Sequence, residues 1–134
     1  MSDAQATSNT SDKPIGELTL RISAMPADTN ANGDIFGCWV MARMDQAAGS
    51  AAVERAQGRV VTVKVDAMHF IRPVKVGDVL CVYCEVIKIG NTSLTLHVEA
   101  WAQRFMTSNM EKVTEATFIF VAIDDNGKTR VVPR

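Results

Sequence analysis

The spacing of hydrophobic side chains changes twice along this chain. Residues 35–55 contain no proline and are rich in Ala, Met, Val and Trp, which predicts one long helix. On both sides of it hydrophobic and polar residues alternate, a pattern typical of strands with one buried face. The predicted strands cover residues 18–22, 60–65 with a continuation at 68–71, 79–89, 93–104 and 113–123.

Turn residues separate these segments. Residues 26–34 are rich in Asn, Asp and Gly, and residues 90–92 have the composition of a hairpin turn. Asp34 and the loop before it supply capping groups for the helix, and Gly58 supplies a stop signal. Consecutive strands linked mainly by hairpins predict an antiparallel sheet. A single sheet and a single apolar helix bury most surface when the sheet curls around the helix, so the predicted fold class is α+β.

Length and charge limit the functions that the chain can have. Its 134 residues suit one domain, and a net charge of −1 gives no overall attraction to nucleic acid or to a membrane surface. Its first dozen residues are small and polar, which is typical of a disordered tail and not of a signal peptide. We expect a tail over residues 1–17, one domain over residues 18–134, and a cytoplasmic protein.

A C-x-x-C spacing, Cys81 to Cys84, raises the question of a metal or redox site. Both residues fall within one predicted strand, where an odd separation puts their side chains on opposite faces. They cannot share a metal ion, and His69 and His97 are the only histidines. We therefore expect no metal site.

The predicted helix carries a carboxylate on its apolar side. At about 100° per residue, its polar residues form one stripe: Arg43, Gln46, Ser50 and Glu54. Asp45 falls almost opposite, among Cys38, Met41, Ala48 and Ala52. Burial of a charged carboxylate costs several kcal/mol unless it is paired. Two interpretations stay open: a structural aspartate satisfied by an arginine, within the chain or across a subunit interface, and a catalytic base whose proton affinity is tuned by burial.

The start of this helix offers the other part of an acyl-transfer site. Gly33 and Gly37 stand there, where free N–H groups and the helix dipole favour a developing oxyanion. A glycine also lets a ligand approach the backbone closely. The sequence contains no Gly-x-Ser-x-Gly motif, and Cys38 has no identifiable histidine partner, so a serine or cysteine nucleophile is disfavoured.

Several stretches closely resemble the YciA-type acyl-CoA thioesterases of the hot-dog fold. One is AMPADTNANGDIFG at residues 24–37, followed by Met44-Asp45. Others are VVTV at residues 60–63, MHFIRPV at residues 68–74 and VGDV at residues 76–79. The resemblance runs from about Leu18 to Pro133, and its first block is more specific than the Arg-Pro and Gly-Asp signals, which hot-dog proteins share widely.

This resemblance implies a fold, an activity and an assembly. The fold is an antiparallel sheet wrapped around one central helix, and the activity is hydrolysis of acyl-CoA to free CoA and a carboxylic acid, with no cofactor besides the CoA of the substrate. A homodimer with joined sheets would be the minimal active unit, and a homohexamer, a trimer of such dimers, the full assembly.

The resemblance also implies roles for single residues. An aspartate at the position of Asp45 acts as general base or nucleophile, an asparagine matching Asn30 assists from the facing half of the site, and the amide near Gly37 polarises the thioester carbonyl. Cys38 stands where many relatives have a second glycine. Its amide is kept, while its side chain would narrow the acyl channel or add an oxidisable thiol.

Recognition of the CoA phosphates requires basic side chains in spite of the neutral overall charge. Arg72, in the Arg-Pro pair, is the strongest of these, and Phe70 would form a wall of the ligand site. Further candidates are Arg59, Lys88, Asn91 and Ser93. Each also has an ordinary interpretation as a solvated charge, a turn residue or a core side chain.

Two other functions compete with thioester hydrolysis. A non-catalytic acyl-CoA sensor on the same fold would carry a DNA-binding or partner domain, for which residues 1–17 leave no room. A hydratase or dehydratase would need a histidine beside the acid, whereas His69 and His97 lie in predicted strands. We therefore expect a thioesterase, whose preferred acyl length cannot be read from the linear pattern.

Overall fold

The computed structural model describes residues 13–134, which form one long helix, a short 3-10 helix and five strands. The features predicted for residues 1–12 lie outside the described residues. The helices are η1 (Pro26–Asp28) and α2 (Gly37–Ala56), and the strands are β2 (Glu17–Ser23), β3 (Val60–Asp66), β4 (Val79–Ile89), β5 (Ser93–Gln103) and β6 (Met110–Ala122). The predicted long helix and the five main strands are confirmed, with boundaries shifted by at most three residues.

One predicted strand segment is wrong. Residues 68–71 do not continue β3 and form no strand of their own. Ala67 follows directly after β3 with φ of 56°, a left-handed backbone conformation that ends the extended run. The chain then leaves the sheet and passes the N-terminal end of α2 before it returns at β4.

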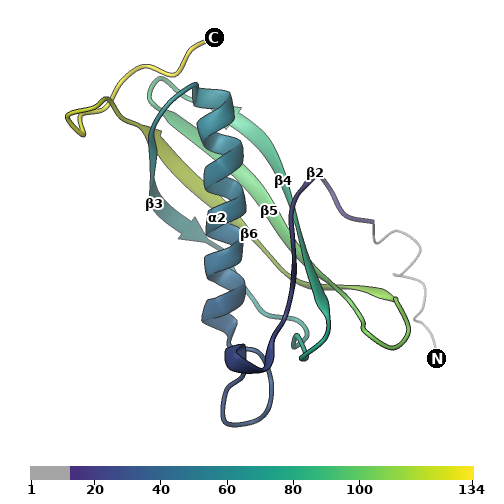
Figure 1. Cartoon of the computed structure of the whole chain (residues 1–134). Coiled ribbons are helices and arrows are strands. Elements are labelled where there is room, and N and C mark those ends of the chain that lie inside the picture. Colours follow the sequence, from purple (N-terminus) through teal and green to yellow (C-terminus); the bar gives the residue numbers. More distant parts are fainter. Residues whose placement is uncertain (1–12) are drawn as a thin grey trace.

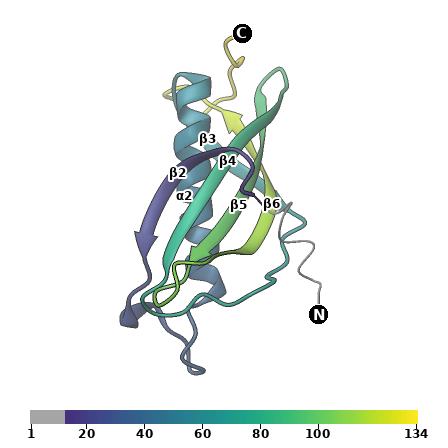
Figure 2. The same ribbon diagram turned by 90° about the vertical axis from the view of Figure 1, so that its right-hand side faces the viewer.

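The strands form a single antiparallel sheet in the order β2-β4-β5-β6-β3. Strands β4, β5 and β6 follow one another as two hairpins, whereas β3 pairs with β6 at the far edge. The predicted antiparallel sheet is confirmed, and residues 67–78, not a hairpin, connect β3 to β4. Helix α2 connects the two edge strands across one face of the sheet. The sheet curves around the helix, which lies along its hollow face (Figures 1 and 2).

The core lies between α2 and the concave face of the sheet. The helix contributes small and medium side chains: Val40, Met44, Ala47, Ala48, Ala52 and Ala56. Alternate buried residues of the central strands pack in the same core: Leu80, Val82, Leu94, Leu96, Val98, Phe118 and Phe120. Full burial of one Val, Leu or Phe side chain contributes about 1.5–3 kcal/mol. The alanines let the helix approach the curved sheet closely, so its two flanks are held in defined positions.

The two cysteines of β4 lie on opposite faces, as predicted. Cys84 packs in the core beneath α2, while Cys81 lies on the outer face opposite Trp101 of β5. Burial raises the pKa of both thiols above the usual value. Within residues 13–134, no helix has the length and hydrophobicity that crossing a membrane requires.

Candidate active site

Asp45 lies on the flank of α2 that faces β3 and is partly buried. Its Oδ1 atom accepts a hydrogen bond of 2.7 Å from the hydroxyl of Thr62 on β3. The sequence projection placed Asp45 in the apolar interior, but Cys38 and Met41 on the same flank are exposed. Full burial was a wrong prediction because β3 is the edge strand, and no further strand among residues 13–134 covers that side of the helix.

The polar stripe predicted on α2 is only partly correct. Gln46, Ser50 and Glu54 are exposed, but the Arg43 side chain folds back over Trp39, with its guanidinium carbon 5.9 Å from the ring centroid. No lysine or arginine of residues 13–134 forms an ion pair with Asp45. Within the described part of one chain, Asp45 is therefore not a structural aspartate neutralised by an arginine.

The N-terminus of α2 has no side-chain cap. Its N-cap residue is Phe36, and Asp34, the predicted cap, pairs instead with the ammonium group of Lys75. The capping prediction was wrong because the helix begins at Gly37, three residues after Asp34. Among residues 13–134, the N–H groups of Gly37 and Cys38 have no hydrogen-bond acceptor. Free amides at the positive end of a helix dipole are suited to bind a developing oxyanion.

A cleft of about 290 Å³ lies beside this helix end. Its walls come from the loop before α2, the first turn of α2, residues 70–74 and Val113 near the start of β6. Four of the predicted site residues line it: Asn30, Gly37, Phe70 and Arg72. These residues are widely separated in the sequence, so the fold brings together the predicted oxyanion site and the strongest candidate for CoA binding.

Each of these residues is held in place by its surroundings. Oδ1 of Asn30 accepts hydrogen bonds from the amides of Asn32 and Asp34, which leaves its side-chain N–H donors without an acceptor among the described residues. A Cβ atom added at Gly37 would lie 3.3 Å from the Phe70 ring, so the ring lies directly over the helix N-terminus.

The Arg72 guanidinium is partly committed to the fold. It donates a hydrogen bond of 2.8 Å to the carbonyl oxygen of Lys112, and the residue is otherwise exposed at the wall of the cleft. Arg72 can thus bind an anion while one nitrogen anchors it to the start of β6.

Four further predicted binding residues lie at the opposite end of α2. Arg59 follows the helix C-terminus and approaches Asp125 at 3.8 Å, while Lys88, Asn91 and Ser93 belong to the β4–β5 hairpin. A 20-residue helix is about 30 Å long. One chain therefore does not bring these residues to the cleft.

Asp45 and the free amides of the helix N-terminus are also separated within one chain. Eight residues of α-helix between Gly37 and Asp45 correspond to about 12 Å along the axis. A carboxylate, a water molecule and a thioester carbonyl in contact span roughly half of that distance. The two parts cannot act on the same carbonyl unless a second copy of the chain supplies one of them.

Thr62 is the residue of this site that the sequence did not indicate. It lies in a strand of valines and alternates as any β-strand threonine would. Its partner Asp45 is 17 residues away, and their contact depends on which edge of the sheet β3 occupies. No local pattern carries that information.

A second polar cluster lies on the outer face of the sheet. The fully buried carboxylate of Glu99 accepts hydrogen bonds from Trp101 and the Ile15 amide and lies 2.8 Å from Nε2 of His97. Burial favours its neutral form, but these hydrogen bonds and the charge of Lys112 outweigh burial and lower the pKa of Glu99 below its usual value.

The same cluster has the residue types of a metal site. Atoms of His97, Glu99 and Glu115 lie within 4.8 Å of one another. However, the Lys112 ammonium group is 3.6 Å from Glu99 and pairs with Glu115, so a side-chain cation already supplies the positive charge. The cluster is better described as an ion-pair network than as a metal centre.

Comparison with known proteins gives consistent results. The family model of the thioesterase superfamily matches residues 32–107. The acyl-CoA thioester hydrolase YciA of Salmonella typhimurium strain LT2 is 52% identical over 123 residues, which cover 90% of this chain and 92% of that protein. A hexameric thioesterase from Yersinia pestis superposes with a TM-score of 0.88 and 52% identity, over 91% of this chain and all of that one.

More distant structures are similar as well. A hexameric hotdog-fold thioesterase of Campylobacter jejuni is 38% identical, with a TM-score of 0.85 over 90% of this chain and 93% of that one. The acyl-CoA hydrolase of Staphylococcus aureus, solved with butyryl-CoA, is 31% identical, with a TM-score of 0.78 over 85% of this chain and 70% of that one. Two alanine variants of that hydrolase have also been solved, one with an aspartate replaced and the other with a threonine replaced. These two positions are 17 residues apart, the same separation as Asp45 and Thr62.

Proposed function

The chain belongs to the thioesterase superfamily and has the hot-dog fold, and we propose that it hydrolyses acyl-CoA to free CoA and a carboxylic acid. The acyl-CoA thioester hydrolase YciA is among its relatives. The observation that carries the proposal is the environment of Asp45. Thr62 orients one oxygen of its carboxylate, and no cation of the described residues neutralises it. The second oxygen is therefore available to a water molecule or to the substrate.

The proposed reaction begins with the thioester carbonyl bound against the amides of Gly37 and Cys38 of one chain. Asp45 of a second copy of the chain takes a proton from water as the water oxygen attacks the carbonyl carbon. Alternatively, the carboxylate attacks directly and forms a mixed anhydride, which water then opens. In both routes the negative charge develops on the carbonyl oxygen, next to the helix amides. Collapse of the intermediate breaks the C–S bond and releases CoA as a thiolate, a good leaving group that needs no strong acid.

Asn30 has a supporting role in this reaction. Its Oδ1 atom accepts hydrogen bonds within the loop, whereas its two side-chain N–H donors have no protein acceptor among the described residues, and the residue lines the cleft. These donors can hold the carbonyl oxygen or the attacking water.

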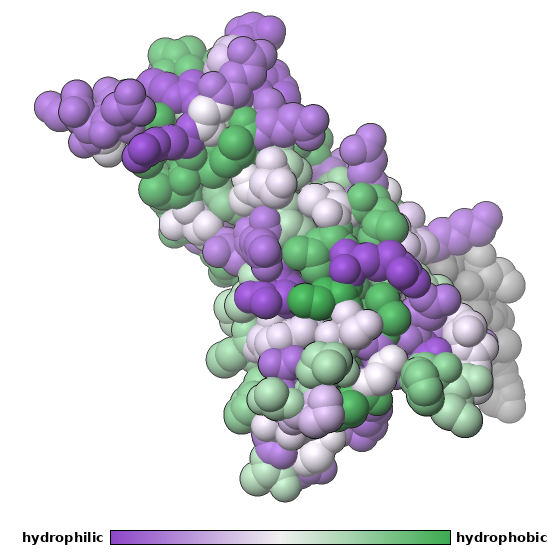
Figure 3. All heavy atoms as spheres, in the orientation of Figure 1, coloured by the Kyte–Doolittle hydropathy of each residue, from purple (hydrophilic) through white to green (hydrophobic). Residues whose placement is uncertain are grey.

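The separation of Asp45 from the helix N-terminus supports a homodimer as the minimal active unit. Strand β3 is an edge strand with exposed Val61, Val63 and Val65, a surface suited to a second copy. Figure 3 shows hydrophobic side chains beside the upper part of α2, where β3 lies. If two β3 strands pair antiparallel, the two helices also run antiparallel. Asp45 of one chain then lies closer to the helix N-terminus of the other chain than to its own.

The same pairing explains the divided set of CoA-binding candidates. In an antiparallel helix pair the C-terminal end of one helix lies near the N-terminal end of the other. Arg59, and beyond it Lys88 with Asn91 and Ser93, would then approach the cleft that contains Arg72 of the second chain. We propose that these residues hold the CoA phosphates and that three dimers form a hexamer. Two related structures are described as hexameric.

We further propose a cytoplasmic location. Cys38, Cys81 and Cys84 are free thiols, and Cys38 is exposed. Unpaired cysteines are typical of a reducing compartment.

A panel of acyl-CoAs from acetyl to palmitoyl, assayed by release of free thiol, tests this function. We expect turnover by the wild type and a reduction of at least about 100-fold in Asp45→Asn, in line with loss of a general base. The amide oxygen can still accept the Thr62 hydrogen bond, so this variant should fold. Glu54→Gln, which removes an exposed carboxylate of the same helix, is the matched control and should keep full activity.

The possible outcomes separate the two functions. Near-normal turnover by Asp45→Asn would refute the role of its carboxylate. Binding of acyl-CoA by the wild type without any thiol release would instead favour a non-catalytic acyl-CoA sensor.

A further inference from the structure

One wall of the cleft is a segment without regular secondary structure. Residues 67–78 connect β3 at one edge of the sheet to β4 near the other, and they pass the N-terminal end of α2 on the way. Residues 70–74 line the cleft. Long connections of this kind in compact domains usually have a functional reason. Without a helix or strand to shape it, this segment depends for its position on side-chain contacts and on a few backbone hydrogen bonds, such as the one of 2.7 Å from the Ile71 amide to the Val113 carbonyl of β6.

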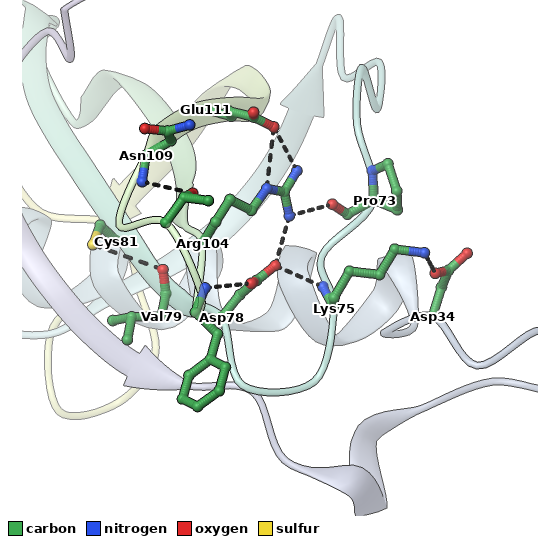
Figure 4. Close-up of polar contacts among 11 residues, drawn as sticks. Asp34, Pro73, Lys75, Asp78, Val79, Cys81, Arg104, Asn109 and Glu111 are labelled. Carbon is green, nitrogen blue, oxygen red and sulfur yellow. Dashed lines mark hydrogen bonds and ion pairs between the residues drawn. The ribbon is translucent and has the colours of Figure 1, made fainter.

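Asp78, at the end of the segment, is the centre of these contacts. Its side chain is buried, with a residue exposure of 3%. Oδ2 accepts hydrogen bonds of 2.9 Å from the Lys75 amide and 2.6 Å from Nη1 of Arg104, while Oδ1 accepts one of 3.1 Å from the Phe105 amide. Figure 4 shows this carboxylate between the segment and the β5–β6 hairpin. Asp78 therefore ties two chain segments that are distant in sequence.

Arg104, just after β5, completes the connection. Its Nη1 atom donates a second hydrogen bond, of 3.0 Å, to the carbonyl oxygen of Pro73, and its Nε and Nη2 atoms donate to Glu111 at 3.1 and 2.9 Å (Figure 4). Burial opposes the charge on Arg104, but the bonds to Asp78 and Glu111 outweigh burial and raise the pKa of the guanidinium. The planar, multi-donor group of an arginine suits this set of acceptors in a way that lysine does not.

The anchored segment in turn positions the rest of the cleft. Pro73 and Val74 line it, and the Val74 carbonyl accepts a hydrogen bond of 3.0 Å from the Ile35 amide, two residues before α2. The next residue, Lys75, pairs with Asp34, whose amide binds Oδ1 of Asn30. A continuous chain of polar contacts thus runs from Arg104 to the loop that carries Asn30.

We propose that Arg104 and Asp78 are positioning residues that hold Pro73 and Val74 against the N-terminal end of α2 and so determine which acyl groups the cleft accepts. This proposal rests on the proposed hydrolysis of acyl-CoA. Neither side chain lines the cleft, and both act through the backbone of the segment between them. Loss of the Arg104 guanidinium frees the Pro73 carbonyl and leaves Asp78 without its strongest partner, so the wall moves and the width of the cleft changes.

The test compares kcat/KM for acetyl-CoA and decanoyl-CoA in Arg104→Met and in a control, Arg130→Met. Arg130 is also partly buried and also donates to two backbone carbonyls, of Ala56 and Ile123, but at the far end of α2. The ratio of the two kcat/KM values does not depend on how much of a sample is folded. We expect this ratio to change by about fivefold or more in Arg104→Met and by less than about twofold in Arg130→Met.

An unchanged ratio in Arg104→Met, with an active wild type, would overturn the positioning role and leave the hydrolase intact. If the wild type released thiol from neither substrate, the proposed function and this inference would both fail. If Arg104→Met does not fold, Arg104→Lys keeps the charge beside Asp78 but loses the forked geometry. That variant should shift the ratio in the same direction by a smaller factor, and no shift would again overturn the proposal.

Discussion

The hydroxyl of Thr62 on β3 lies 2.7 Å from the carboxylate oxygen Oδ1 of Asp45 on α2. This hydrogen bond joins the central helix to the edge strand of the sheet and fixes the orientation of the carboxylate. Because a threonine donates only one hydrogen, Oδ2 of Asp45 is left for another partner. In the proposed mechanism that second oxygen accepts the proton or attacks the thioester, so kcat should depend on Thr62.

Replacing Thr62 with valine should therefore lower kcat. A hydrogen bond to a charged group is worth about 1.5–3 kcal/mol, which corresponds to a decrease of roughly 10-fold to 100-fold if the carboxylate loses its orientation. Steady-state release of free thiol measures the effect. Thr62→Ser keeps the hydroxyl and should stay close to the wild type, whereas wild-type turnover by Thr62→Val would show that the bond is not needed.

The exposed edge of β3 should be required for assembly and activity together. Val63 is 54% exposed in one chain, and a second β3 strand would cover it. A glutamate there would place like charges near each other across a two-fold interface and bury them. We expect Val63→Glu to have a smaller mass by light scattering and little activity. Val131→Glu, at a similarly exposed valine near the C-terminus, should keep the wild-type mass. An unaltered assembly in Val63→Glu would exclude β3 as the interface.

A methyl group at Gly37 should impair catalysis more than folding. Its Cβ atom would lie 3.3 Å from the Phe70 ring, which must shift by a few tenths of an ångström next to the free helix amides. Misplacement on this scale can lower kcat/KM by about tenfold. Gly49→Ala is the matched control, since its Cβ would meet Phe120 at an ordinary 3.8 Å.

Gly49→Ala should instead stabilise the helix by roughly 0.5–1 kcal/mol without loss of activity. Adding Phe70→Leu to Gly37→Ala should recover part of the lost kcat/KM, because a smaller side chain relieves the contact. If the double variant is as impaired as the single one, the contact with Phe70 is not the cause.

The buried Glu99 should make the protein less stable in acid. Its pKa is lower in the folded state than the usual value of 4.5, so its contribution to stability is complete above about pH 4.5 and is lost as the pH falls through the folded-state pKa. Thermal unfolding between pH 3 and pH 7 should show a steeper acid loss in the wild type than in Glu99→Gln.

At neutral pH the Glu99→Gln variant should be less stable by about 1–3 kcal/mol, because a neutral amide replaces the charged acceptor of Trp101 and His97. Glu85→Gln, at an exposed position of the neighbouring strand, is the control and should follow the wild type at every pH. Parallel acid profiles for the wild type and Glu99→Gln would contradict this role of Glu99.

Periodicity and turn chemistry determined the local structure of this protein. The long helix, the five main strands and the opposite faces of Cys81 and Cys84 follow from side-chain spacing, because a helix repeats every 3.6 residues and a strand every two. The same spacing singled out Asp45 as a carboxylate away from the polar stripe of its helix. These features depend on residues close together in the chain.

The tertiary structure decided which surfaces of those elements stay uncovered and which distant residues come into contact. Strand order makes β3 an edge, so Asp45 lies on an uncovered flank beside Thr62 and not in the core. It also gathers Asn30, Phe70 and Arg72 around Gly37 and separates them from Arg59, Lys88, Asn91 and Ser93 by the length of α2. Contacts between distant segments depend on how the strands pair and on which surfaces stay free, and no local period of the sequence encodes either property.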